Sequence, residues 1–228
     1  MSATPMWGRC IELLPGQQQQ IIAHHPICWL PWATLTPHGP HLARGVAALI
    51  AEAVATGAAR RVGGVVYPLL WHERTADDPL FQQWLAAQLI SLAAQGFQMA
   101  VVIGLPETAT ADLALIETAE MVMAQHHLLT LAIAPFELVD STMHDQGALW
   151  ETSLLEAIRP DLVDRSQPVL NDRRDVRDVA SPSLGQQALT LASEQLAKAV
   201  QVVHSHQNTA AVAALYQQRR ARYHRLTL

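Results

Sequence analysis

Two histidines three residues apart, His38 and His41, stand in a stretch rich in proline and glycine, residues 36–42, which reads TPHGPHL. Neutral imidazole is a common metal ligand, so this pair could face one metal ion. A turn shaped by proline and glycine, with histidines that form local hydrogen bonds, explains the same residues. A metal site normally needs three or four protein ligands, so the spacing alone favours the turn.

Further side chains suited to metal or acid–base chemistry are scattered along the chain: His72, Glu73, Glu107, His144, Asp145 and Glu151. None of them has the HxH or HExxH spacing that fixes the geometry of a metal site in advance. Nucleophilic catalysis has no better support, because the chain lacks a GxSxG elbow and Ser153 falls inside a predicted helix. Cys28 falls in a predicted strand, where burial would make its thiol inert.

Short apolar runs of strand length alternate with longer runs of helical period, and these elements must position the side chains named above. Such alternation is typical of an α/β protein, and it predicts a single three-layer αβα domain with a mostly parallel sheet. The predicted strands are residues 27–30, 62–70, 97–103 and 128–134. The predicted helices are residues 41–56, 80–95, a helix capped by Thr110, 150–158, 181–204 and 210–225.

Three glycines punctuate this pattern. Gly57 is predicted to end the first helix, and Gly63 with Gly64 indicates a bulge or a close backbone approach in the second strand. The carboxyl ends of parallel strands meet at one sheet edge, where ligands bind in folds of this class. We therefore expect the loops 33–41, 71–79, 104–109 and 140–150 to form the rim of a site.

Composition favours one domain over residues 1–228, with a core at about 25–165 and a helical region at about 182–226. A net charge of −5 gives no general reason to bind nucleic acid or an anionic membrane. No apolar stretch reaches the ~20 residues of a membrane span, and the two cysteines lack CxxC spacing, so a cytoplasmic protein is expected.

Two segments fall outside the alternating pattern. The polar stretch 164–181 predicts a surface excursion that either covers the site or reaches a neighbouring subunit. A basic run near the C-terminus is interpreted as a solvated helix end or a subunit contact rather than a phosphate-binding patch. That run comprises Arg219, Arg220, Arg222, His224 and Arg225.

Four motifs in one order and at one spacing resemble those of the creatininase (creatinine amidohydrolase) family, over roughly residues 25 to 165. They are HGPHL at 38–42 with Gly45; Tyr67 with His72; GF at 96–97 with Gly104; and Gly147 followed by WETSLL at 150–155 and RPDLV at 159–163. The resemblance implies the creatininase fold and ring-like homo-oligomers, often hexamers. A complex with an active paralogue is a further possibility.

The same resemblance implies a hydrolytic site with two adjacent divalent cations that activate a water molecule. Thr36, Ala47 and Leu105 stand where the family has three of its metal ligands. His38 and Glu107 are the two ligand candidates that remain, so no cofactor is expected, or at most one weakly bound zinc or manganese ion.

The resemblance also places the remaining site residues. Gln146 stands at the position of the family's catalytic histidine, and an amide cannot donate and accept a proton near neutral pH as imidazole does. Asp145 and Glu151 keep carboxylates that are candidates for catalysis. The binding pocket is predicted to include Tyr67, Trp71, His72 and Trp150, although core packing or a subunit interface explains tryptophans equally well.

Two functions are compatible with these residues. The first is a pseudoenzyme, which binds a small molecule or acts as an assembly subunit after losing the binuclear hydrolytic site. The second is a diverged hydrolase of a small cyclic amide or another C–N bond. Such an enzyme would use His38 and Glu107 around one metal ion or none, helped by Asp145 or His72. A site rebuilt from the rim residues His41, His72, Glu73, His144 and Asp145 is also conceivable.

Overall fold

The computed structural model describes residues 6–72, 77–167 and 179–226, and its central feature is a parallel six-stranded sheet. The strand order is β1-β3-β2-β5-β6, with the short strand β4 paired to the end of β2. The strands are β1 (Trp7–Arg9), β2 (Ile27–Ala33), β3 (Gly64–Val66), β4 (Leu70–Trp71), β5 (Met99–Ile103) and β6 (Leu129–Ile133). Every pairing among them is parallel, which confirms the predicted fold class.

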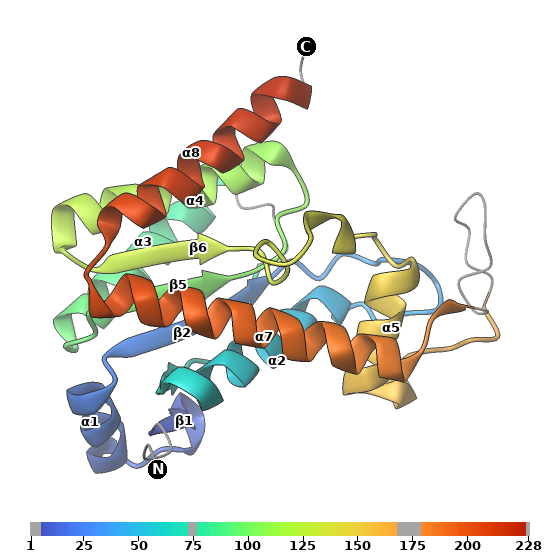
Figure 1. The fold of residues 1–228 in the computed structure, drawn as a ribbon, viewed down its shortest axis with the longest axis horizontal. Helices are drawn as coiled ribbons and strands as arrows, with labels where there is room; N and C mark the ends of the chain where they lie inside the picture. Colours follow the sequence, from blue (N-terminus) through green and yellow to red (C-terminus); the bar gives the residue numbers. More distant parts are fainter. Residues whose placement is uncertain (1–5, 73–76, 168–178, 227–228) are drawn as a thin grey trace.

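Helices cover both faces of this sheet (Figure 1). They are α1 (Pro15–His24), α2 (Val46–Val62), α3 (Pro79–Ala94), α4 (Ala109–His126), α5 (Leu149–Ile158), α7 (Pro182–Ser205) and α8 (Thr209–Leu226). Helix α2 lies on one face with α7 and α5 packed against it, and α3 pairs with α4 on the other. Single 3-10 turns occur at Cys10–Glu12, Ser141–Met143 and Pro160–Leu162. No helix in the described ranges is long and apolar enough to cross a membrane.

The central strand β2 is buried at every residue, because strands lie on both sides of it and helices cover both faces. It continues to Ala33, three residues beyond the prediction, because its end pairs with β4 through Trp32 and Ala33. The neighbouring strand β3 is shorter than predicted, since residue 62 still belongs to α2.

The predicted end of the first long helix was wrong. Helix α2 runs through Gly57 and ends before Gly63, whose φ of 96° is a left-handed conformation that suits glycine. A Cβ atom on Gly57 would lie 2.3 Å from the Ser193 hydroxyl of α7, so this glycine makes room for a helix crossing. Gly64 is the predicted close approach, because a Cβ there would lie 2.4 Å from the Ile27 carbonyl.

Helix starts follow the capping residues of the sequence, with one shift. Asp78 accepts a hydrogen bond from the Leu80 N–H and caps α3 as predicted, and Ser181 caps α7 in the same way. Helix α4 is capped by Thr108 rather than Thr110, because the Thr108 hydroxyl accepts the Ala111 N–H. Both threonines offer the same cap, so sequence does not separate them.

The N-terminal elements β1 and α1 escaped prediction. Strand β1 has three residues, all half-buried, and α1 buries Ile21 as its single fully buried side chain. A weakly amphipathic helix and a very short strand give little periodic signal. Strand β1 extends the sheet beyond β3, and α1 packs against both of these strands.

Helix α8 covers β6, the strand at the other edge of the sheet from β1. The Tyr216 hydroxyl donates to the Thr130 carbonyl at 2.9 Å and accepts the Ala132 N–H at 2.7 Å, as a neighbouring strand would. Arg219 is 2% exposed, donates to the Ala132 carbonyl and pairs with buried Asp112.

Three arginines of the basic run, Arg219, Arg220 and Arg222, are therefore paired within the chain, whereas the prediction gave a solvated helix end or a subunit contact. The side chains of His224 and Arg225 lie outside the described part of the chain. Besides the buried pair of Arg219, Arg220 pairs with Glu120 and Arg222 with Glu137 on neighbouring elements. The carboxylate partners lie far from the basic run in sequence, so the sequence of the run alone could not predict these ion pairs.

Replacing Arg219 with leucine should lower the free energy of unfolding by about 3–5 kcal/mol, because it leaves the buried Asp112 carboxylate without its cationic partner. The neighbouring variant Arg220→Leu is the matched control, since it breaks a partly exposed pair and should cost less than about 1 kcal/mol. Urea denaturation of both variants measures the difference. Equal losses would show that the buried Arg219–Asp112 pair contributes no more to stability than the partly exposed Arg220–Glu120 pair.

Candidate functional site

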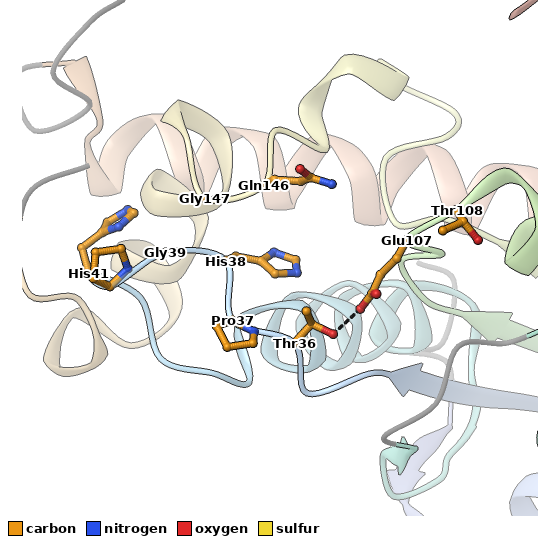
Figure 2. A pocket seen from close by; sticks show the side chains of 10 residues that line it. Thr36, Pro37, His38, Gly39, His41, Glu107, Thr108, Gln146 and Gly147 are labelled. Atoms are coloured by element: carbon orange, nitrogen blue, oxygen red, sulfur yellow. Dashed lines mark hydrogen bonds between the residues drawn. The ribbon is translucent and has the colours of Figure 1, made fainter. Parts of the chain in front are cut away.

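Three loops that follow or precede core elements enclose a cavity of about 450 Å³ at the carboxyl edge of the sheet (Figure 2). The loop after β2 supplies His38, the loop after β5 supplies Glu107, and the loop before α5 supplies Gln146. The side chains of these three residues point toward one space in Figure 2. The remaining lining residues are Thr36, Pro37, Gly39, Pro40, His41, Thr108 and Gly147.

His38 is held by a buried carboxylate behind it. Its Nδ1 lies 2.7 Å from an oxygen of Glu151, which is 2% exposed, and the same oxygen accepts the Gly147 N–H at 2.7 Å. Glu151 accepts the hydrogen bond, so the protonated nitrogen of His38 is Nδ1. This hydrogen bond also raises the pKa of His38 above its ordinary value. Glu151 thus orients the imidazole rather than lining the cavity itself.

Glu107 faces His38 from the other side, but hydroxyl groups already occupy one of its oxygens. Thr34 and Thr36 both donate hydrogen bonds to Oε1 of Glu107 (the Thr36 bond is drawn in Figure 2). Thr36 stands at a position where the resemblance expects a metal-binding carboxylate. At this position the chain has a hydrogen-bond donor, which satisfies the Glu107 carboxylate without a cation.

A small apolar cluster is formed by Ala33, Ala47, Ala48 and Leu105, with Leu69 packed against it. Ala47 and Leu105 are 4% and 7% exposed. They occupy the two other positions at which the resemblance expects metal ligands. Two of the three positions at which the resemblance expects metal ligands are therefore joined in one apolar contact.

Asp145 acts on the backbone of α5. Its two carboxylate oxygens accept the Trp150 N–H at 2.6 Å and the Glu151 N–H at 3.2 Å, two of the unpaired donors at the helix start. Burial raises the pKa of this carboxyl group. Gln146 follows with a φ of 48°, and this left-handed backbone turns its amide toward the cavity.

None of the four predicted pocket residues Tyr67, Trp71, His72 and Trp150 lines this cavity, although all four are described. The Tyr67 hydroxyl accepts from Gln18 of α1 and donates to Gln95 at the end of α3. Trp71 is 57% exposed, and the His72 ring packs on Phe81. Trp150 is half-buried against the core.

The rim histidines of a rebuilt site do not gather in the described ranges. His41 is buried and bonds to the Thr152 hydroxyl at 2.9 Å. His144 packs against Phe136, and burial lowers the pKa of its ring to about 4. Within residues 6–72, 77–167 and 179–226, no three His, Cys, Asp or Glu side chains form a group that could hold a metal. Glu73 lies outside the described residues.

The predicted inert thiol of Cys28 also has a defined place. Burial raises the pKa of the Cys28 thiol well above its ordinary value, which agrees with an unreactive cysteine. Trp29 and Trp32 are core residues, 0% and 1% exposed. The surface excursion predicted at 164–181 lies largely outside the described residues, since 168–178 are not described.

Sequence reasoning assigned no role in the site to two residues that shape it, Thr34 and Gly147. The Thr34 hydroxyl donates a hydrogen bond to Glu107, 73 residues away, and no local sequence pattern predicts this bond. Gly147 has a φ of 84°, and a Cβ there would lie 1.6 Å from the His38 carbonyl. A glycine immediately before a helix start was a signal for such a contact.

No protein-family model matches this chain, and no curated protein matches it. Solved structures do. A single-site mutant of creatininase shares 19% identity and a TM-score of 0.69, over 84% of this chain and 97% of that one. A manganese form of creatininase shares 18% identity and a TM-score of 0.69, over 84% and 96%. The fold is creatininase-like.

A putative creatinine amidohydrolase from Bacteroides fragilis NCTC 9343 has the same creatininase-like fold, with 16% identity and a TM-score of 0.62. The alignment covers 86% of this chain and 95% of that one. Identities below one fifth carry the fold and leave the chemistry to the residues present. The residues present do not fit two metal ions, because Ala47 and Leu105 fill their positions with apolar contacts and Thr36 bonds to Glu107.

Replacing Gly147 with alanine should destabilise the chain by more than about 2 kcal/mol, because the new methyl group would overlap the His38 carbonyl. Gly96→Ala is the matched control, since its φ of 95° imposes similar strain. Its nearest atom, on Ile22, is 3.7 Å away, so about 1 kcal/mol is expected there. Chemical denaturation compares the two, and equal losses would contradict a tight contact between the two loops.

Proposed function

We propose that this chain is a non-hydrolytic, creatininase-like protein that binds a small polar molecule in the cavity between His38 and Glu107. The observation that carries the proposal is the apolar cluster of Ala47 and Leu105 with Ala33 and Ala48. An apolar contact has no donor atom for a cation, and burying a cation against it would be strongly unfavourable.

The hydrogen bonds of the site support the same conclusion. Glu151 accepts from His38 and Gly147, and Asp145 accepts from the start of α5. Glu107 accepts from two threonine hydroxyls. Both oxygens of Asp145 and one oxygen each of Glu107 and Glu151 therefore accept hydrogen bonds from the protein, which leaves few carboxylate oxygens to ligate a cation.

The cavity itself supports retention of a binding role. Its volume of about 450 Å³ lies in the range of small-molecule sites, and its polar groups converge from three different loops. Gln146 offers both a donor and an acceptor where a catalytic histidine was expected. Such groups recognise a ligand by hydrogen bonds without transferring its protons.

Location and assembly complete the proposal. Two free cysteines, Cys10 and Cys28, suit a reducing compartment, so we place the protein in the cytoplasm. The net charge of −5 favours neither nucleic acid nor an anionic membrane as a partner. A homo-oligomer, or a complex with an active paralogue, would be the context of the binding role.

Purified full-length protein should contain clearly less than about one zinc or manganese ion per chain, because His38 and Glu107 are too few ligands for tight binding. Elemental analysis by mass spectrometry measures this content after growth with both metals. A variant with Thr36→Glu, Ala47→Asp and Leu105→His restores the three lost ligand types and should gain metal. Two tightly bound ions in the unmodified chain would overturn the proposal.

A second candidate, a diverged hydrolase of small cyclic amides, is favoured by the oriented pair of His38 and Glu151. A carboxylate that fixes the Nδ1 proton leaves Nε2 available as a base or as a ligand of one metal ion. In this function His38 and Glu107 would carry the chemistry, with Asp145 maintaining the loop.

If hydrolysis of a cyclic amide is found, His38→Ala with Glu107→Ala should reduce kcat/KM by at least about 100-fold, the usual contribution of acid–base groups. The exposed variant His206→Ala serves as the control and should leave the rate unchanged. Activity that survives the double replacement would rule out this assignment of roles.

A further inference from the structure

A second and larger cavity is separate from the cavity around His38. It is a groove of about 870 Å³ formed by β1, α2, the end of α5 and α7, where α7 packs across α2 (Figure 1). Among the described residues, none lines both this groove and the cavity around His38. We call it the arginine groove, because its lining includes Arg9, Arg60, Arg61 and Arg159.

The arginine groove is positively charged, although the chain as a whole has a net charge of −5. Its lining holds four arginines and two carboxylates, Glu12 and Glu52, which leaves an excess of two positive charges. Both carboxylates pair with the same residue, Arg9. The other three guanidinium groups therefore face the groove without a carboxylate from its own lining.

Two of these three arginines form exposed ion pairs. Arg61 lies 3.4 Å from Glu194 and Arg159 lies 2.6 Å from Asp161, and the two arginine side chains are 38% and 50% exposed. Such pairs contribute only about 0–1 kcal/mol to stability. A phosphate monoester carries close to two negative charges at neutral pH, so it can compete with these carboxylates for the guanidinium groups.

Arg60 is held in place by an aromatic ring rather than by a carboxylate. Its guanidinium carbon lies 5.1 Å from the ring centre of Trp7 on β1. Among the residues that the structure describes, no carboxylate pairs with Arg60 and no hydrogen bond uses its donors. Stacking on a ring fixes the plane of a guanidinium and leaves its N–H edge available, and that edge matches two oxygens of a phosphate.

The end of α2 explains one of its two arginines. Arg60 and Arg61 are both in the last turn, where cations offset a partial charge of about −0.5. Arg61 meets this need, because it donates a hydrogen bond to the Gly57 carbonyl at 2.8 Å. The charge of Arg60 exceeds what the helix end requires.

We propose that the arginine groove binds a small organic phosphate, whose phosphate group contacts Arg60 and whose organic part lies along an apolar wall. The groove has the volume of a small-molecule site, which is more than a bare phosphate ion needs. The net charge of −5 opposes a polyanion such as nucleic acid, whereas a small ligand senses mainly the charges within about 8 Å. The apolar wall comprises Trp7, Leu49, Ala53, Ile158 and Leu189.

Equilibrium dialysis of the full-length protein with AMP, an organic phosphate, tests the proposal against adenosine, its uncharged counterpart. AMP should bind at least about tenfold more tightly than adenosine, because a hydrogen bond to a charged group contributes at least that factor. Arg60→Gln should weaken AMP binding by the same factor or more. Arg220→Gln on α8 is the matched control, since it removes the same charge outside the groove and should change the affinity by less than about twofold.

Two variants of Trp7 separate the stacking ring from the charge of Arg60. Trp7→Leu keeps all four arginines but removes the ring, so it should weaken AMP binding by about threefold, as expected for the loss of an exposed cation–π contact. Trp7→Phe keeps a ring and should bind AMP more tightly than Trp7→Leu. Circular dichroism should show both variants folded. Equal affinity of the two would contradict the role of the ring.

Four outcomes would overturn the proposal. The first is that neither AMP nor inorganic phosphate binds, and the second is that adenosine binds as tightly as AMP. The third is that Arg60→Gln leaves AMP binding intact while Gln146→Ala abolishes it, which would place the ligand in the cavity around His38. The fourth is that a single-stranded DNA oligonucleotide binds more tightly than AMP, which would indicate a nucleic-acid surface. None of these outcomes bears on the metal content of the site around His38.

Discussion

The site is organised around one buried charge, the carboxylate of Glu151, which is 2% exposed. Removing a carboxylate from water is unfavourable by several kcal/mol unless hydrogen bonds replace its hydration. His38 and the Gly147 N–H supply those bonds, and they come from loops more than a hundred residues apart in sequence. The loop after β2 therefore cannot move away from α5 without exposing this charge. The cavity exists because those two loops are held at a fixed distance.

Much of the fold could be predicted because the signals were local. Apolar runs marked four of the strands, and Asp78 and Ser181 marked helix starts by their own hydrogen bonds. The rule that parallel strands end at one edge correctly brought His38, Glu107 and Gln146 together. What failed was decided by partners distant in sequence. Gly57 was predicted to end a helix, but it lies within α2 and makes room for α7 to pack closely. Arg219 was predicted in a solvated helix end or a subunit contact, but it is buried and paired with Asp112.

The motif resemblance predicted where residues of the site lie in the fold better than it predicted which side chains line the cavity. It singled out Ala47 and Leu105, far apart in sequence, which the structure joins in one apolar cluster. Tyr67 and Trp71 were expected in the binding pocket, and they do not line the cavity between His38 and Glu107. The Tyr67 hydroxyl bonds to Gln18 of α1, and Trp71 is 57% exposed. A residue can keep its place in a motif while its side chain turns elsewhere, because side-chain direction depends on neighbours that the motif does not contain.

Strand β6 depends on a residue that is made much later. The Tyr216 hydroxyl, which pairs with the edge of β6, lies 86 residues after its partner Thr130. During synthesis at roughly 5–20 residues per second, the strand therefore emerges several seconds before the helix that covers it. In that interval the nascent chain carries an open strand edge able to pair with another chain. The last helix thus also determines how long newly made protein is exposed to misassembly.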